Sequence, residues 1–553
     1  MRFAWMNGSR LNRRLLFLIP GCLWLFAQLS TGQVANASAP VTSQWVYYDA
    51  EHRLQYKPLP GGDRIMDFST AGYEQGAASI PEATVQVTLG PSGSDDTERI
   101  QRAIDQVSKL GPGSNGLRGA VLLLPGAYSV GGSLTIQASG VVLRGSGSGS
   151  SPESNTVITL KSAKKPYPLF VLGTRDERPT MKGHVHRVTD GYVRSGFNTL
   201  YLDSAAGLEV GDRVIITRPV TPQWVAFMGM DDSGCGSARK KPCWIEHGST
   251  RLRTDRTITA ITGNQITLDA PMSDSIDSRY CGSGGATLQA YTFPGRISQV
   301  GVERVRAVAP AIETLKPGDA TYQLAVSCAV EDAWIRNLTA QDTQQSVVID
   351  DYSKQVTVKN VDIEHTVPQA KLTKGAMFEE FYISSATQVL MEDLTATADK
   401  TLFFSTSAET QGPNVLRNSK FVGNNSRIEP HQRWATGLLI ENTHIENNSH
   451  STSKRPNTIN LCDRGRYGTF HGWAIGWGVV WNCSADRFTI QMPPGSQNWC
   501  IGCSGVQEEK PVPGGGSKKL PQGAIDARDK TVTPLSLYDA QLKDRLGAIP
   551  SLK

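Results

Sequence analysis

A short pattern that recurs through the second half of the chain limits its possible folds more than any other feature. Alternating apolar residues lead to one charged residue, then to Asn or Asp, and then to a second alternating pair. The Asn and Asp positions are Asn337, Asn360, Asp393, Asn418, Asn442 and Asn482, with spacings of 23, 33, 25, 24 and 40 residues. Strands with a period of two that recur about every 20 to 50 residues are typical of a solenoid. The repeat therefore predicts an all-β solenoid built from stacked coils.

A spacing of 23 to 25 residues is enough for one coil of three short strands and three turns. The two longer spacings add a loop to the same coil. Because side chains alternate along a strand, the apolar residue two positions before each Asn or Asp is expected in the core, and the charged residue next to it outside. The expected core set is Ile335, Val358, Met391, Leu416, Ile440 and Val480. The Asn and Asp side chains are expected in a column at one turn, bonding the coils above and below.

The first part of the chain fits the same architecture. Asp95-Asp96-Thr97-Glu98 precedes a helical apolar pattern that ends at Gly111-Pro112, which predicts a capped amphipathic helix. Such a helix would cover the open end of the solenoid, where a sheet edge must be hidden. Short strands are predicted at 120–124, 128–130, 134–136, 141–143 and 157–160.

Three runs resemble the start of the pectate-lyase-like superfamily. They are the segment from Gly93 to Asp105, Val121-Leu-Leu-Leu-Pro-Gly-Ala-Tyr-Ser-Val130 and Ser139-Gly-Val-Val-Leu-Arg-Gly-Ser-Gly147. With the repeats, the resemblance covers most of residues 80–505. It implies a right-handed parallel β-helix and a carbohydrate substrate, but no single reaction, because lyases, hydrolases, epimerases and phage depolymerases share this scaffold. The acidic cluster and arginine base of calcium pectate lyases and the aspartate-rich motifs of polygalacturonases are not found.

Two segments depart from the repeat. Alternating residues at 208–216 and 258–268, with Gly263-Asn264 as a hairpin turn, predict a small β-rich insertion over 200–277. Helical spacing at 535–546 predicts a helix that caps the far end of the solenoid. The predicted order is a signal peptide at 1–37, an extended arm at 38–79, β-helix at 80–199, the insertion, the main β-helix at 278–505, and a linker with the capping helix at 506–553.

The first 37 residues have the order of a secretory signal. Four arginines precede or begin an apolar run from 15 to 29, and Ala35-Asn36-Ala37 offers small residues for cleavage near Ala37. A secreted or periplasmic protein with no membrane span is therefore expected, and a monomer. Without these arginines the net charge falls from +5 to near +1. A nucleic-acid-binding protein usually carries an excess of basic residues, so nucleic acid is not expected as a partner.

Eight of the nine cysteines remain after removal of the signal, and an even number permits disulfides in an exported chain. Cys235 and Cys243 would close one short loop. Cys500 and Cys503 have the spacing of half a zinc site, but no flanking Cys/His pair completes it. Structural roles are expected for all eight.

Two histidine-containing runs hold the residues best suited to chemistry. They are Glu429-Pro-His-Gln-Arg-Trp434 and Asp463-Arg-Gly-Arg-Tyr-Gly-Thr-Phe-His-Gly-Trp473. The long spacings are expected to place both in loops of one turn, and coils about 4.8 Å apart would bring these loops together. His or Tyr can take a proton, and Arg can bind a carboxylate through two hydrogen bonds. The predicted catalytic residues are His431, Arg433, His471, Arg464 and Tyr467. The alternative is that these side chains only brace long turns.

Tryptophans near these runs offer faces for sugar rings. Trp481 takes the outward position that charged residues hold in the other coils, and Trp473 and Trp477 share its parity. The predicted substrate-binding residues are Trp434, Trp473, Trp477, Trp481, Arg466 and His365. The alternative for Trp481 is cover by the C-terminal segment.

These residues favour one reaction and leave others open. Elimination beside a uronic carboxylate needs a base and a neutralising cation, so a polysaccharide lyase is the leading expectation. Glu379 or Glu380 with a second acid would instead serve a glycoside hydrolase, and a third alternative is a non-catalytic glycan-binding solenoid or adhesin. No cofactor is required, although Ca²⁺ on the paired acids, such as Asp350-Asp351, is a further alternative.

Overall fold

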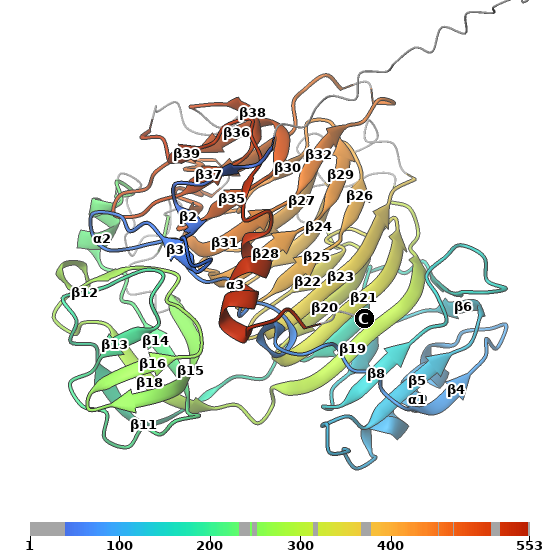
Figure 1. Cartoon of the computed structure of the whole chain (residues 1–553). Helices are drawn as coiled ribbons and strands as arrows, with labels where there is room; N and C mark the ends of the chain where they lie inside the picture. The colour runs from blue at the N-terminus through green and yellow to red at the C-terminus, as the bar shows by residue number, and fades with distance from the viewer. Residues whose placement is uncertain are drawn as a thin grey trace, which may run out of the picture. The chain divides into compact units, whose positions relative to one another are not determined.

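The computed structural model of the chain describes residues 39–231, 244–245, 252–312, 319–366, 378–451, 453–467, 469–509 and 520–550. Its main feature is a 28-stranded sheet whose strands pair in parallel and wind into stacked coils (Figure 1). This confirms the predicted all-β parallel β-helix. The predicted signal peptide at 1–37, Cys235, Cys243 and most of the tail linker lie outside the described residues.

Each coil contributes strands to three faces. Face 1 contains β4 (Val85–Leu89), β5 (Gly119–Leu123), β8 (Val141–Arg144), the first parts of β19 (Ile297–Val308), β21 (Val330–Gln341) and β23 (Lys354–Glu364), then β25 (Leu390–Glu392), β28 (Gln411–Arg417), β31 (Ala435–Glu441), β34 (Ile475–Gly476), β35 (Val479–Trp481), β37 (Trp499–Ile501) and β39 (Ala524–Asp526).

Face 2 contains β6 (Gly126–Val130), β9 (Thr156–Leu160), the second parts of β19, β21 and β23, then β26 (Thr395–Thr397), β29 (Lys420–Gly423) and β32 (His444–Asn447). Face 3 contains β7 (Leu134–Ile136), β10 (Pro168–Gly173), β20 (Gln323–Cys328), β22 (Val347–Ile349), β24 (Phe378–Ile383), β27 (Thr401–Thr406), β30 (Arg427–Ile428) and β33 (Thr458–Leu461). In the last coils β36 (Ser484–Ile490) and β38 (Ser504–Gln507) serve faces 2 and 3 together.

The turn between faces 1 and 2 is the column of Asn and Asp residues predicted from the repeat. All six residues have positive φ, from 46° at Asn442 to 56° at Asp393. Asn and Asp tolerate this left-handed conformation better than other side chains, which explains why they recur at one position. Asn360 Nδ2 donates to Asn337 Oδ1 at 2.7 Å, a direct bond between neighbouring coils. The expected core residues before them are fully buried.

The first helix, α1 (Thr97–Ser108), packs its apolar side on the first coils as predicted, with Ile100 and Ile104 in the main core. The last helix, α3 (Leu537–Leu546), forms where helical spacing predicted it. It lies over face 1 beside β25 and β28 rather than over the far end (Figure 1). Arg417 and Asp539 join it to the coils with an ion pair of 2.6 Å.

The N-terminal arm also covers face 1. It begins with β1 (Val41–Thr42), β2 (Val46–Tyr48) and β3 (Leu54–Tyr56), and β1 pairs in parallel with β40 (Val532–Thr533) near the C-terminus. Further along, the short helix η1 (Tyr73–Gly76) reaches earlier coils, where the Tyr73 ring lies 5.5 Å from that of Trp334. The arm therefore runs along face 1 from the last coils back to the first.

This cover changes the surroundings of the charged residues before the Asn and Asp column. They do point out of the core, but four of the five are buried under the arm and α3 instead of facing water, and Lys359 is half-buried. Glu441 is 0% exposed, and its carboxylate accepts hydrogen bonds from Ser536 Oγ and Leu537 N at 2.7 Å. A periodic pattern shows the direction of a side chain, but not which distant segment will cover it.

The insertion is larger than the predicted 200–277. Its six-stranded antiparallel sheet runs from β11 (Thr180–Arg187) to β18 (Thr287–Thr292), in the order β11-β18-β14-β15-β16-β13. Its other strands are β13 (Thr199–Tyr201), β14 (Arg213–Thr217), β15 (Arg253–Thr262) and β16 (Gln265–Leu268), accompanied by β12 (Tyr192–Val193), β17 (Ile276–Asp277), α2 (Pro222–Phe227) and the short helix η2 (Ser278–Tyr280). The outer pair β11 and β18 is separated by about a hundred residues in sequence, so no local pattern marked it.

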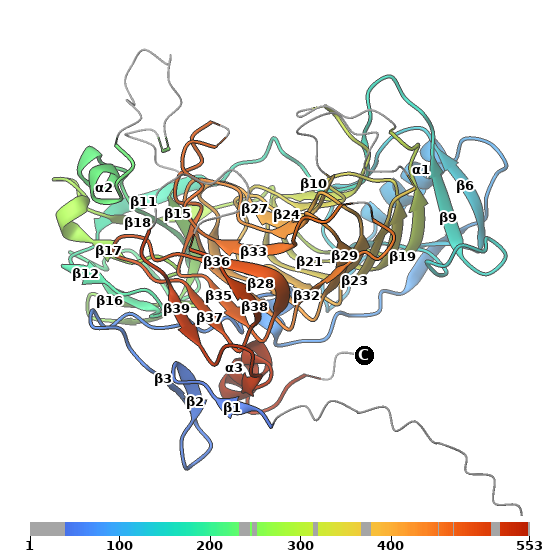
Figure 2. The ribbon, with the colours of Figure 1, turned by 90° about the horizontal axis from the view of Figure 1, so that it is seen from above.

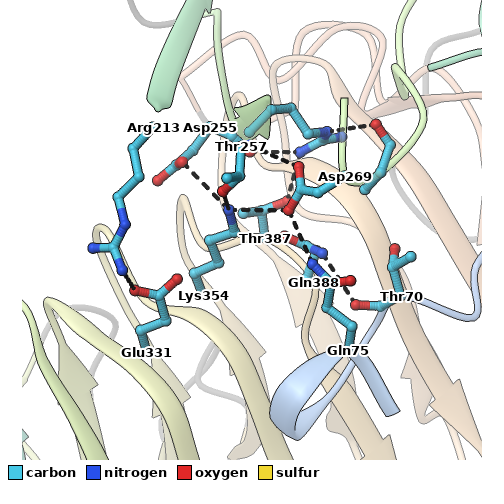
Figure 3. A network of polar contacts seen from close by, with 12 residues as sticks. Thr70, Gln75, Arg213, Asp255, Thr257, Asp269, Glu331, Lys354, Thr387 and Gln388 are labelled. Atoms are coloured by element: carbon cyan, nitrogen blue, oxygen red, sulfur yellow. Dashed lines mark hydrogen bonds and ion pairs between the residues drawn. The ribbon is translucent and has the colours of Figure 1, made fainter. Parts of the chain in front are cut away.

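A buried polar network fixes the insertion to the coils and the arm (Figure 3). Lys354, on β23, is 1% exposed, and its Nζ lies 3.3 Å from Asp269 and 3.7 Å from Asp255 of the insertion. Gln75 of the arm donates to the same Asp269 carboxylate at 3.1 Å. A buried ammonium is costly unless it is paired, so the position of Lys354 depends on the insertion being docked.

The cysteines do not support the predicted disulfides. The six in the described part of the chain, Cys281, Cys328, Cys462, Cys483, Cys500 and Cys503, are all buried and free. Cys483, Cys500 and Cys503 belong to the main core, where a thiol behaves as a small apolar group. Among the residues described, no helix has the length and apolar character needed to cross a membrane.

Candidate functional site

The long loops leave the coils at two turns, not at one. The loops at 429–434 and 462–474 connect face 3 to face 1, whereas His365 and His450 lie at the turn between faces 2 and 3. The two runs around His431 and His471 therefore share one turn, as expected, and His365 and His450 lie at another. The two runs that hold most of the predicted catalytic residues do follow neighbouring coils and meet. In Figure 2 the last coils, with β35, β37 and β39, lie on the side of the insertion, and the first coils, with β6 and β9, lie on the opposite side.

The structure brings the predicted catalytic residues His431, His471, Tyr467, Arg464 and Arg433 into one group, called here the histidine cluster. The rings of His431 and His471 are 4.7 Å apart, and the ring of Tyr467 is 5.4 Å from that of His471. The Arg464 guanidinium lies 5.0 Å from the Tyr467 ring centre. The backbone N–H of Arg433 donates to the His471 carbonyl at 3.0 Å.

A buried carboxylate holds Arg464 in this position. Glu429 is 3% exposed, and its Oε1 lies 2.9 Å from Arg464 Nε, while Asn460 Nδ2 donates to its Oε2 at 2.6 Å. Arg464 Nη1 then donates to the His431 carbonyl at 2.5 Å. Burial alone would raise the pKa of Glu429, but Arg464 and Arg427 outweigh it and hold the pKa below its ordinary value.

Both histidines are kept neutral by their surroundings. Burial lowers the pKa of His431 to about 4, with Arg464 as the next cause. Burial, Arg464 and His431 together lower the pKa of His471 to about 3. A neutral imidazole can accept a proton at neutral pH. The cluster therefore combines two proton acceptors with cationic side chains.

Tyr382 is a member of this site that the sequence did not single out. Its hydroxyl lies 3.4 Å from Nδ1 of His431. Burial raises its pKa, with Glu379 as the next cause, so the phenol keeps its proton. Its neighbours Phe381 and Ile383 are buried in the core, and strand alternation could have placed Tyr382 on the outer side.

The predicted acids Glu379 and Glu380 lie on the same strand, toward the turn between faces 2 and 3. Glu380 is 0% exposed, accepts from Ser346 Oγ at 2.8 Å and pairs with His365 Nε2 at 2.7 Å. Glu379 accepts from Gln345, and burial raises its pKa. His365 is thus held by a carboxylate inside the turn, and the predicted role in binding substrate is not supported by this position.

The four tryptophans predicted to bind sugar are occupied by other contacts. They are 0 to 3% exposed. Trp434 Nε1 and Trp477 Nε1 donate to Asp274 of the insertion at 2.9 and 3.3 Å, and Trp473 packs in one cluster with Trp224 and Trp244. Trp481 Nε1 donates to the Pro534 carbonyl at 2.9 Å, so the C-terminal segment covers it. For Trp481 the alternative of cover by the C-terminal segment is therefore the correct one. At 0 to 3% exposure none of the four rings offers an open face to a sugar, and Trp434, Trp473 and Trp477 only line the walls of the cleft described below.

Within the described residues, no three His, Cys, Asp or Glu side chains are grouped in a way that would hold a metal ion. Asp350, one of the acids considered for Ca²⁺, forms an ion pair with Arg175 at 2.7 Å. Arg466, predicted to bind substrate, is exposed at the tip of the loop that carries His471.

No family model and no curated protein matches the sequence. Solved structures resemble the fold at low identity. The exopolygalacturonase of Thermotoga maritima is 9% identical, with 78% of this chain and 77% of that chain covered and a TM-score of 0.32. A tailspike of E. coli bacteriophage HK620, solved with a hexasaccharide, is 11% identical over 81% of this chain and 66% of its own, with a TM-score of 0.37. The Gp54 tailspike of Acinetobacter baumannii bacteriophage AP22, solved with a capsular saccharide, is 9% identical over 80% and 73%, with a TM-score of 0.28.

Proposed function

We propose that this chain is an exported enzyme that cleaves a uronate-containing polysaccharide by β-elimination at the histidine cluster. The observation that carries the proposal is that two neutral histidines, His431 and His471, lie beside the guanidinium of Arg464. Elimination needs this combination of an unprotonated base and a cation near the substrate carboxylate. The predicted signal at 1–37 would deliver the enzyme to where such polymers occur.

His431 is assigned as the base. It removes the proton on the carbon next to the uronic carboxylate, and the electron pair of that C–H bond forms a carbon–carbon double bond. The bond to the glycosidic oxygen breaks, and this oxygen takes a proton. Tyr382, which is protonated and lies 3.4 Å from His431, is the donor.

Arg464 and Arg433 are assigned to the substrate carboxylate. They neutralise the charge that develops as the proton leaves, which is the main barrier to this reaction. A bound carboxylate would also act on His431. Because a negative charge favours the protonated imidazole, it would raise the pKa of His431 and make it a stronger base only in the complex.

The hydrolase alternative depends on a different pair of groups. The raised pKa of Glu379 would suit a general acid. A hydrolase also needs a second carboxylate facing the same bond. Glu429 is already paired with Arg464 and Glu380 with His365, which favours the lyase. A glycan-binding protein without activity is the remaining alternative.

The classes are separated by incubating the protein with alginate, polygalacturonate, hyaluronan and neutral dextran. Elimination produces both reducing ends and the ultraviolet absorbance of a conjugated double bond, whereas hydrolysis produces only reducing ends. His431→Ala should lower turnover by about 10²- to 10⁴-fold, and His450→Ala, at the other turn, is the matched control. Reducing ends without ultraviolet absorbance, lost in Glu379→Gln, would establish the hydrolase instead.

A further inference from the structure

A cleft of about 930 Å³ lies behind the histidine cluster, between the insertion, the N-terminal arm and the last coils. A second lobe of about 580 Å³ continues it toward η2. The two lobes share Gly61, Tyr192, Phe227, Met228, Pro494 and Gly495 in their linings. Ligand sites in proteins are commonly concave, with volumes of roughly 300 to 1,000 Å³.

The loop at 462–474 is the wall between this cleft and the histidine cluster. Asp463, Arg466 and Phe470 line the cleft, whereas Arg464 and His471 belong to the cluster. The tip of the loop, at Arg466 and Tyr467, is exposed. A polymer bound at the cluster would therefore need to cross only this tip to enter the cleft.

The lining combines ring faces with charged and polar edges. Phe227 is 38% exposed and stacks on Tyr280 with ring centres 4.4 Å apart. Tyr192 donates to the buried carboxylate of Asp63 at 2.8 Å, which fixes its ring at the wall. The charged residues that line the first lobe are Asp63, Asp463 and Arg466, and those that line the second are Arg194, Arg218, Arg279, Asp274 and Asp277.

These features match the surface of a glycan. A pyranose presents an apolar C–H face to an aromatic ring and hydroxyl groups at its edge. Of the four arginines in the lining, Arg218 and Arg279 form ion pairs with aspartates of the insertion. Arg194 and Arg466 are exposed, where they can reach the carboxylates of a bound chain. A lipid chain would instead need a lining without ion pairs such as that of Arg279 and Asp277.

We propose that this cleft binds a further stretch of the same acidic polysaccharide, on the far side of the loop from the site of cleavage, with Phe227 as its stacking platform. The inference rests on the proposed function for the nature of the polymer. Phe227 lies where the two lobes meet, so a chain occupying both would pass over its ring.

The test is retention of the protein in gels that contain alginate, polygalacturonate or hyaluronan, with dextran as the neutral control. Phe227→Ala should weaken retention by on the order of tenfold, because the buried apolar area of one ring is lost, and Phe227→Trp should restore it. The effect should grow with chain length when defined oligosaccharides replace the polymer. Tyr201→Ala removes a more exposed aromatic ring on β13, outside the cleft, and should have no effect.

Retention that is equal in Phe227→Ala and wild type would overturn the inference, and would mean that another part of the chain or a different ligand fills the cleft. Elimination activity measured in parallel keeps the two proposals apart. Wild-type protein that cleaves an acidic glycan but shows no Phe227 effect refutes only the cleft. If the wild-type protein is neither retained by any of these glycans nor able to cleave them, both proposals are refuted.

Discussion

The chemistry of His431 and His471 depends on their neighbours more than on their own properties. An exposed histidine has a pKa of about 6.5, and burial beside Arg464 lowers both well below this value. The residue that fixes Arg464 is Glu429, which itself touches neither imidazole in the described contacts. A substitution at Glu429 should therefore change the position of Arg464 and, through it, the pKa of His431.

The pH dependence of activity should reveal the pKa of His431. The base acts in its neutral form, so kcat/KM should fall as the pH drops through about 4, the pKa of His431, and not near 6.5. In Arg464→Gln the loss of the cation should move the titration of His431 upward, as followed by NMR of its ring. An unchanged titration in that variant would show that Arg464 does not control the histidine.

Glu429→Gln tests the support of Arg464. The substitution leaves a buried guanidinium without its carboxylate, which costs about 3 to 5 kcal/mol when a buried pair is broken. Urea unfolding should show this loss, and turnover should fall more than substrate affinity because Arg464 loses its position. Glu446→Gln, which changes an exposed carboxylate on β32, is the matched control. Normal stability in Glu429→Gln would contradict the proposed support.

The sequence was sufficient to predict that the two histidine-containing runs would come together, but not which residues of distant segments would pack against them. The two runs around His431 and His471 met because they follow neighbouring coils. Trp434 and Trp473, in the same runs, were assigned to substrate because only local parity was available. The contacts that bury them come from Trp224, Trp244 and Asp274 of the insertion, and no local pattern encodes such distant partners.

At the scale of elements, the insertion packs against the coils next to the histidine cluster and buries their tryptophans. The carboxylate of its Asp274 accepts hydrogen bonds from Trp434, Trp477 and Arg218, the last at 2.6 Å. One carboxylate therefore satisfies three donors from two parts of the chain. This makes Asp274 the residue whose loss should affect docking of the insertion most directly.

Asp274→Asn should loosen the insertion without unfolding the coils. Arg218 would lose its buried ion pair, so stability should fall by about 3 kcal/mol or more. Limited proteolysis should cut the insertion sooner, and tryptophan fluorescence should shift to longer wavelengths as Trp434 and Trp477 become wetter. Glu209→Gln, on the exposed part of the insertion, should match wild type in both measurements. Equal protease resistance in Asp274→Asn would refute this role.

At the scale of the whole molecule, the repeat was sufficient to predict the coils, because one αL turn per coil imposes Asn or Asp at a regular interval. The cover of face 1 was not predictable in the same way. The arm and α3 lie outside the repeat, and their partners are from about a hundred to several hundred residues away in the sequence. The strand pairing of β11 with β18 was missed for the same reason.

Circular dichroism should reflect this balance of elements. Strands make up 44% of the described residues and helices 8%, so the far-ultraviolet spectrum of the protein without residues 1–37 should be dominated by β-structure. A helical content near the one-third that is usual in globular proteins would be incompatible with the fold.

The arm that runs along face 1 gives this solenoid an unusual folding problem. Stacked repeats touch only their neighbours, so a plain solenoid can unzip coil by coil from either end. Here Val41 pairs with Val532, and the Trp45 ring lies 6.0 Å from that of Trp499. The described residues that are synthesised first can thus form these contacts only after the last residues have been made. A contact between residues so far apart in the sequence is slow to form. Once the arm is in place, it contacts both the last coils and earlier ones. Unfolding of a terminal coil would therefore also break the contacts of the arm along face 1, and thermal unfolding is expected to be a single cooperative transition.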